Sequence, residues 1–129
     1  MNVALKVGSL LDQDSNPKEH LLDMIKGLRK RNFTFYVTAS TPDLVRLIAA
    51  GVYSHIETKS YDDDTAIDVV ITDSVDEAHE CIAENTPVLL WDRTDTWIKP
   101  TASCSVVSNW WDIYQHLCTI QSHHKGWIR

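Results

Sequence analysis

Short apolar runs alternate along this chain with longer segments that have helical spacing. The clearest unit begins with the apolar run at residues 69–71, which Asp73 and Ser74 follow. A continuous apolar run of this kind is typical of a strand buried on both faces of a parallel sheet. Ser74 and Glu77 form an S-x-x-E capping box, which predicts a helix directly after the strand. Asp73 is therefore expected at the carboxyl end of a central strand, where open α/β sheets bind their ligands.

The rest of the chain repeats this alternation of strand and helix. Cap-and-proline pairs predict the start of two helices, at Asn16-Pro17 and at Thr41-Pro42, and Gly51 is expected to end the second. Ser108 is expected to cap the last helix. The other strands are predicted at residues 2–7, 33–37, 52–58, 87–91 and 103–107. The strand within 52–58 is expected at an edge of the sheet.

This order of elements predicts a fold class. Strands that alternate with helices form βαβ units and a mostly parallel sheet, and right-handed crossovers place helices on both faces. We therefore expect an α/β fold, a three-layer α/β/α sandwich with a Rossmann-like sheet. It should form a single domain over residues 1–120 without a cap domain, followed by a tail at 121–129.

Composition narrows the function classes. The net charge of −6 argues against general binding to nucleic acid or to an anionic membrane. A basic run at residues 29–31 lies at the predicted end of the first helix, where the helix dipole favours cations. We prefer this structural role for the run to a role in binding nucleic acid. The three cysteines lack metal-ligand or redox spacing and fit a reducing cytosol. The chain also lacks a signal-like segment and a long apolar stretch, so a cytoplasmic protein is expected.

The order of elements and several short motifs together resemble those of a known family. These motifs are Tyr-Val-Thr at residues 36–38, Lys59, Val-Val-Ile-Thr-Asp-Ser at 69–74, and the segments 87–93 and 107–113. Together they resemble the haloacid dehalogenase (HAD) superfamily, and in particular its small members related to the deoxyribonucleotidases. The resemblance implies a Rossmann-like sheet and phosphoryl transfer through an aspartyl-phosphate with bound Mg²⁺.

The first motif of that family is degenerate in this chain. The family has an apolar strand ending in Asp-x-Asp, whereas residues 3–11 place Lys6 at the position of the nucleophile and Gly8 at that of the acid/base. An ammonium group has no free lone pair and repels a metal ion. In the fourth motif Thr72 replaces the first acid and Asp73 keeps the second, which leaves Asp73 as a weak metal ligand. The usual phosphatase mechanism is therefore not expected.

Two interpretations of Lys6 stay open. Its ammonium group is expected either to take the place of the metal ion and pair with Asp73, or to reach solvent at the strand end with its stem packed on the sheet.

Three functions follow from these residues. The first is a non-catalytic HAD-like protein that binds a protein partner, for which Trp97 and Trp127 in predicted loop or tail segments are anchor candidates. The second is a protein that binds a small phosphorylated ligand at the carboxyl edge of the sheet. The residues expected to bind that ligand are Lys6, Gly8, Ser9, Thr38, Lys59, Thr72 and Asp73.

The third function is a weak or rearranged Mg²⁺-dependent phosphomonoesterase. Its residual catalytic candidates are Asp73, Thr38 and Lys59, and the acids Asp12 and Asp14 of the first loop could also serve. No cofactor is expected for the two binding functions, and Mg²⁺ is expected only with residual phosphatase activity. The non-catalytic binding functions are preferred because both catalytic acids of the first motif are replaced.

Overall fold

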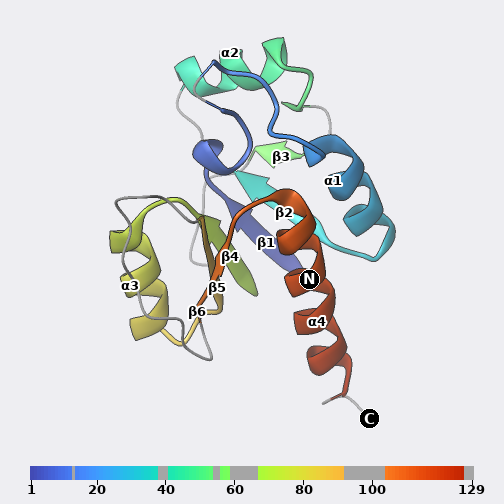
Figure 1. The fold of residues 1–129 in the computed structure, drawn as a ribbon, viewed down its shortest axis with the longest axis vertical. Helices are drawn as coiled ribbons and strands as arrows, with labels where there is room; N and C mark the ends of the chain where they lie inside the picture. Colours follow the sequence, from blue (N-terminus) through green and yellow to red (C-terminus); the bar gives the residue numbers. More distant parts are fainter. Residues whose placement is uncertain (13, 38–40, 54–55, 59–66, 92–103, 127–129) are drawn as a thin grey trace.

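Within the described residues of a computed structural model, six strands form one sheet in which every neighbouring pair is parallel. The structure describes residues 1–12, 14–37, 41–53, 56–58, 67–91 and 104–126. The strands lie in the order β3-β2-β1-β4-β5-β6, so β1 and β4 are the two central strands (Figure 1). This is the Rossmann-like order, in which the direction of the chain across the sheet reverses between β1 and β4. The predicted α/β class and parallel sheet are confirmed.

The bounds of the elements are close to those that the apolar runs predict. The strands are β1 (Asn2–Leu5), β2 (Thr34–Val37), β3 (Glu57–Thr58), β4 (Val69–Thr72), β5 (Val88–Trp91) and β6 (Cys104–Val107). The helices are η1, a single 3-10 turn (Val7–Ser9), α1 (Leu21–Lys30), α2 (Thr41–Ala49), α3 (Val75–Ala83) and α4 (Trp110–Gly126). The strand expected at an edge of the sheet is β3, which pairs with β2.

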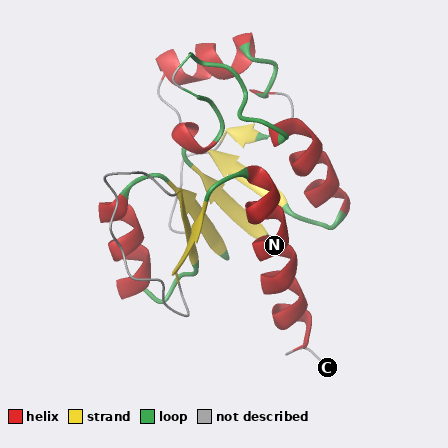
Figure 2. Cartoon of the chain, in the orientation of Figure 1, coloured by secondary structure: helices red, strands yellow, loops and turns green. Residues whose placement is uncertain are grey.

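Alternate residues of the central strands point into two separate cores. Val69 and Ile71 of β4 belong to the larger core, which the buried residues of α1 and α4 complete. Val70 belongs to the smaller core on the other side of the sheet, with Ala78 and Cys81 of α3. All four residues of β4 are buried, as expected for a strand covered on both faces (Figure 2).

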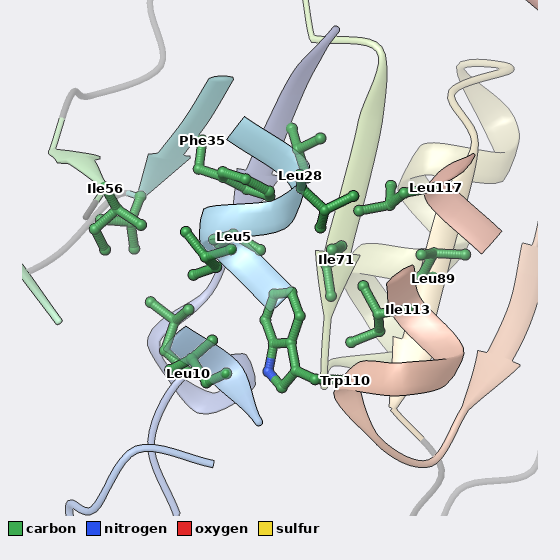
Figure 3. Packing of buried hydrophobic residues seen from close by; sticks show 14 of the residues in the cluster. Leu5, Leu10, Leu28, Phe35, Ile56, Ile71, Leu89, Trp110, Ile113 and Leu117 are labelled. Atoms are coloured by element: carbon green, nitrogen blue, oxygen red, sulfur yellow. The ribbon is translucent and has the colours of Figure 1, made fainter. Parts of the chain in front are cut away.

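Trp110, the first residue of α4, is the largest fully buried side chain. Figure 3 shows its indole between Leu5 and Leu10 on one side and Ile71 and Ile113 on the other. Its Nε1 donates a hydrogen bond to the carbonyl oxygen of Ser9 at 2.9 Å. The start of α4 is thereby fixed to the turn that follows β1.

The predicted start of α1 was wrong. The helix begins at Leu21 and not at Asn16-Pro17, because the preceding residues form a loop of their own. The Asp12 carboxylate accepts the N–H groups of Asp14 and Asn16, and Pro17 forms a bridge with Leu11. The Asn-Pro pair is therefore used in a turn, where it is equally well suited.

The ends of α4 also differ from the prediction. Asn109 and not Ser108 caps the helix, because the Asn109 side chain accepts the N–H of Asp112 at 2.9 Å. At the other end α4 continues through residues 121–126, where we expected a tail. Gln121 is buried and donates to the carbonyl of Arg31 at 2.6 Å, which attaches this last part of the helix to the end of α1.

The predicted cap of α3 and the predicted end of α2 are confirmed. Ser74 caps α3 by accepting the N–H of Glu77, and Gly51 follows α2 with a φ of 74°. None of the helices in the described ranges is long and apolar enough to cross a membrane. Trp97 and Trp127, the two anchor candidates for a protein partner, lie outside the described residues.

Candidate functional site

The carboxyl ends of β1 and β4 meet at the centre of one edge of the sheet. The strands pair with Leu5 opposite Ile71, and the Lys6 N–H donates to the Ile71 carbonyl at 3.3 Å. This pairing places Lys6 and η1 beside Thr72 and Asp73. Most of the predicted site residues that the structure describes are thus brought together, as the parallel topology requires.

Lys6 makes an ion pair at this position. Its Nζ lies 3.5 Å from Oε2 of Glu77 on α3, with the two side chains 37% and 23% exposed. One of the two open interpretations paired Lys6 with Asp73 and the other let it reach solvent, and the ion pair found for Lys6 is with Glu77. Because both groups keep contact with water, the pair is a modest stabilising interaction.

Thr72 joins this pair to the strand. Its side chain is fully buried, its hydroxyl donates to Oε2 of Glu77 at 3.1 Å, and its Oγ1 accepts the N–H of Ser74 at 3.0 Å. A capping box would turn the Glu77 carboxylate back toward the Ser74 N–H. Here only the half from Ser74 to the Glu77 N–H forms, because the carboxylate binds Thr72 and Lys6 instead.

Gly8 and Asp73 face each other across the ends of the two strands. A Cβ atom built at Gly8 would lie 2.9 Å from Cγ of Asp73, and still closer to its Oδ2. Any side chain at position 8 would therefore displace the Asp73 carboxylate. In the HAD resemblance position 8 holds the acid/base aspartate, and here a side chain at that position would have to move the Asp73 carboxylate.

Ser9 lies beneath the site. It is fully buried, and its hydroxyl donates to the Ile71 carbonyl at 3.5 Å while its own carbonyl accepts from Trp110. Ser9 is one of the predicted ligand-binding residues, and these contacts hold this last residue of η1 against Ile71 and Trp110. The other two predicted ligand-binding residues, Thr38 and Lys59, lie outside the described residues.

The described residues fit a magnesium ion poorly. No group of three or more His, Cys, Asp or Glu side chains among them is placed to hold a metal ion. At the strand ends Oε2 of Glu77 already accepts from Thr72 and lies beside a cation, Lys6. The ammonium group would repel a second cation at the same place. Asp12, one of the two acids considered in the first loop, has its carboxylate engaged by the loop backbone.

Sequence reasoning missed a cavity at the same edge of the sheet, beyond the ends of β5 and β6. It has a volume of about 210 Å³ and is lined by Lys18, Glu19, Trp91, Ser108, Asn109 and Trp110. Lys18 lies over the ring of Trp91, with Nζ 4.3 Å from the centroid. The sequence gives no local signal for the contact between Lys18 and Trp91. The predicted helix start at Asn16-Pro17 places Lys18 in α1, whereas α1 begins at Leu21.

A second cavity, of about 230 Å³, lies along α3 on the side of the smaller core. It is lined in part by the acids of one helix face, Glu77, Glu80 and Glu84, with Cys81 among them. Burial, followed by the charges of these three glutamates, raises the pKa of the Cys81 thiol to about 11. A thiol of this kind stays protonated and inert at neutral pH, as expected for a buried structural cysteine.

No protein-family model matches this chain, and no curated protein matches it either. Function must therefore be inferred from the geometry of the strand ends.

Proposed function

We propose that this protein is a non-catalytic member of the HAD-like fold, a three-layer sandwich without a cap domain, which acts by binding a small phosphorylated ligand. The observation that carries the non-catalytic part of the proposal is the ion pair between Lys6 and Glu77 at the end of β1. A tethered cation there takes the place that a catalytic carboxylate and its metal ion need. The ligand part is supported by the carboxyl edge of the parallel sheet, where folds of this kind bind their ligands.

The chemistry of the two replaced positions supports this proposal. An aspartyl-phosphate requires a carboxylate oxygen at the end of β1, and the Lys6 ammonium cannot attack phosphorus. Protonation of the leaving group requires an acid at position 8, but the Asp73 carboxylate packs against Gly8. Acid/base help alone contributes about 10²–10⁴ in rate, so the loss of both groups removes the reaction.

A magnesium-dependent hydrolysis assay tests the proposal. The wild type would be compared with Asp73→Ala over a broad panel of phosphomonoesters, with Asp76→Ala as a matched control on the exposed first turn of α3. We expect no turnover by the wild type above that of Asp73→Ala. Turnover that Asp73→Ala abolishes and Asp76→Ala retains would overturn the proposal, and the weak phosphomonoesterase would then be the correct function.

A protein partner is the second candidate function. It is supported by exposed apolar side chains on α2, where Val45 and Ile48 are 61% and 60% exposed one helical turn apart. Such a pair is a small patch, well below the size of a stable interface. Replacement of both residues by serine should leave the binding of phosphorylated ligands unchanged and should abolish any association with a partner.

A further inference from the structure

We propose that the cavity beyond the ends of β5 and β6 is the binding site for a small phosphorylated anion. The proposal rests on the proposed function for the class of ligand, but it assigns that ligand to a different place from the Lys6 site. A volume of about 210 Å³ is below the range of cavities that hold drug-sized molecules. It suits inorganic phosphate or a phosphomonoester with a small organic group.

The positive charge of Lys18 is available in this cavity. No carboxylate pairs with Lys18 in the part of the chain that the structure describes, and its Nζ rests over the face of Trp91 at 4.3 Å. An aromatic face attracts an ammonium group but leaves it without a counter-ion. The nearby Glu19 carboxylate lies 3.4 Å from His20 Nε2 and is largely exposed. Lys18 can therefore turn toward an anion without breaking an ion pair.

Trp91 supplies an independent indication of a ligand. It lines the cavity, is only 7% exposed, and its Nε1 is a buried donor with no hydrogen-bond partner among the described residues. Buried donors of native proteins nearly always have an acceptor, so an orphaned one indicates a group that is still to be supplied. A phosphate oxygen is such an acceptor, and Lys18 over the face of the same ring supplies a positive charge near it.

The start of α4 adds to the positive electrostatic potential in the cavity. The helix has 17 residues and begins at Trp110, which together with Asn109 lines the cavity. Asn109 caps the Asp112 N–H, and the Asp112 carboxylate accepts the Ser108 N–H at 3.3 Å. The partial positive charge of the helix start acts on an anion in the cavity, although the Asp112 carboxylate offsets part of it. We therefore expect weak binding of a small anion.

The Lys6 site lacks this combination. Glu77 lies 3.5 Å from the Lys6 ammonium, and the Asp73 carboxylate lies against Gly8 in the same place. A phosphate there would meet two carboxylates for one described cation. At the β5/β6 end the acids Glu19 and Asp112 also lie near the cavity, but neither pairs with Lys18 among the described residues. This end is therefore the better anion site.

Calorimetric titration with inorganic phosphate, glycerol phosphate and acetate tests this assignment. Phosphate and glycerol phosphate should bind, and acetate should bind more weakly because it has fewer acceptor oxygens.

Lys18→Met should weaken phosphate binding by at least about tenfold, the size of one lost charge-assisted contact. Lys18→Arg should retain most of the binding, and Lys26→Met, on the exposed face of α1, is the matched control. Trp91→Phe should weaken binding and reduce the tryptophan fluorescence change caused by the ligand, of which Trp110 could still report a part.

The outcomes separate the two proposals. If Lys6→Met abolishes phosphate binding and Lys18→Met leaves it unchanged, the ligand binds at the ends of β1 and β4, so this inference fails and the proposed function stands. If neither phosphate probe binds the wild type at millimolar concentration, the inference fails together with the phosphorylated-ligand part of the proposed function. The hydrolysis assay reports on the non-catalytic part independently of either result.

Discussion

The carboxyl edge of the sheet presents two lysines in different electrostatic settings. At the ends of β1 and β4, Lys6 pairs with Glu77, whose carboxylate also accepts the Thr72 hydroxyl. At the ends of β5 and β6, Lys18 lies on the ring of Trp91 with no carboxylate partner in the described residues. A carboxylate neutralises an ammonium group, whereas an aromatic ring only attracts it. From this comparison we expect an anion to bind beside Lys18 and not beside Lys6.

Trp110 connects the two regions. Its side chain lines the cavity beside Trp91, and its Nε1 bonds to the Ser9 carbonyl under the Lys6 site. The indole itself is fully buried in the larger core. A change at Trp110 should therefore affect both regions at once.

Trp110→Ala should have the largest effect on stability. Truncation of a fully buried tryptophan costs about 3–5 kcal/mol through lost burial and the cavity left behind. Trp110→Phe keeps most of the packing but leaves the Ser9 carbonyl without its donor, at about 1–3 kcal/mol. Urea denaturation measures both values. A cost for Trp110→Ala equal to that of the exposed Trp111→Ala would contradict the role of Trp110 as the link.

The charge of Glu77 reaches beyond Lys6 to the Cys81 thiol. The pKa of Cys81 is raised from 9.0 to about 11, so at pH 8 its thiolate fraction is about 100-fold lower than that of an ordinary thiol. Iodoacetamide should modify Cys118, which is half-buried, far faster than Cys81, as followed by mass spectrometry. Glu77→Gln removes a charge that raises this pKa, so it should speed the modification of Cys81. An unchanged rate would mean that the Glu77 charge does not affect the Cys81 thiol.

The same thiol gives a pH dependence of stability. The neutral form of Cys81 is favoured in the folded state, since its folded pKa lies above the unfolded value of 9.0. Its contribution is complete below pH 9 and is lost as the pH rises from 9 toward 11. In Cys81→Ser the decline of stability over this window should be shallower than in the wild type.

Local patterns predicted the centre of the fold well and its connections poorly. The β4–α3 unit followed from an apolar run and the Ser74 cap, because both signals depend on adjacent residues. The start of α1 did not follow, because the Asp12 carboxylate organises the loop that contains Asn16-Pro17. That competition between a loop and a helix start cannot be judged from cap residues alone.

The candidate site was predicted as a location but not as a set of contacts. The parallel strands brought Lys6, Gly8, Thr72 and Asp73 together, as topology requires. The pairing of Lys6 with Glu77 depends on which way the first turn of α3 directs its carboxylate, which is a matter of tertiary packing. The contact of Lys18 with Trp91 joins residues that no sequence spacing relates.

Gly8→Ala should be the next largest change and tests the packing at the β1/β4 end. The added methyl group collides with the Asp73 carboxylate, so we expect a loss of about 1–3 kcal/mol. The backbone at Gly8 does not have the positive φ of Gly51, so the collision alone should cause the loss. In an Asp73→Ala background the cost should fall to less than half, and a double-mutant cycle in urea measures this coupling. Equal costs in both backgrounds would contradict the contact.

The smallest effects distinguish the two lysines most directly. Lys6→Met removes a partly exposed ion pair and should cost about 0.2–1 kcal/mol. Lys18→Met should cost less, because methionine keeps an apolar contact with the Trp91 ring. Urea denaturation of Lys6→Met, Glu77→Gln and the double variant should show coupling that shrinks in 1 M salt, where the screening length is about 3 Å. No coupling at low salt would mean that Glu77 leaves Lys6 uncompensated, and the two strand ends would then be equivalent as anion sites.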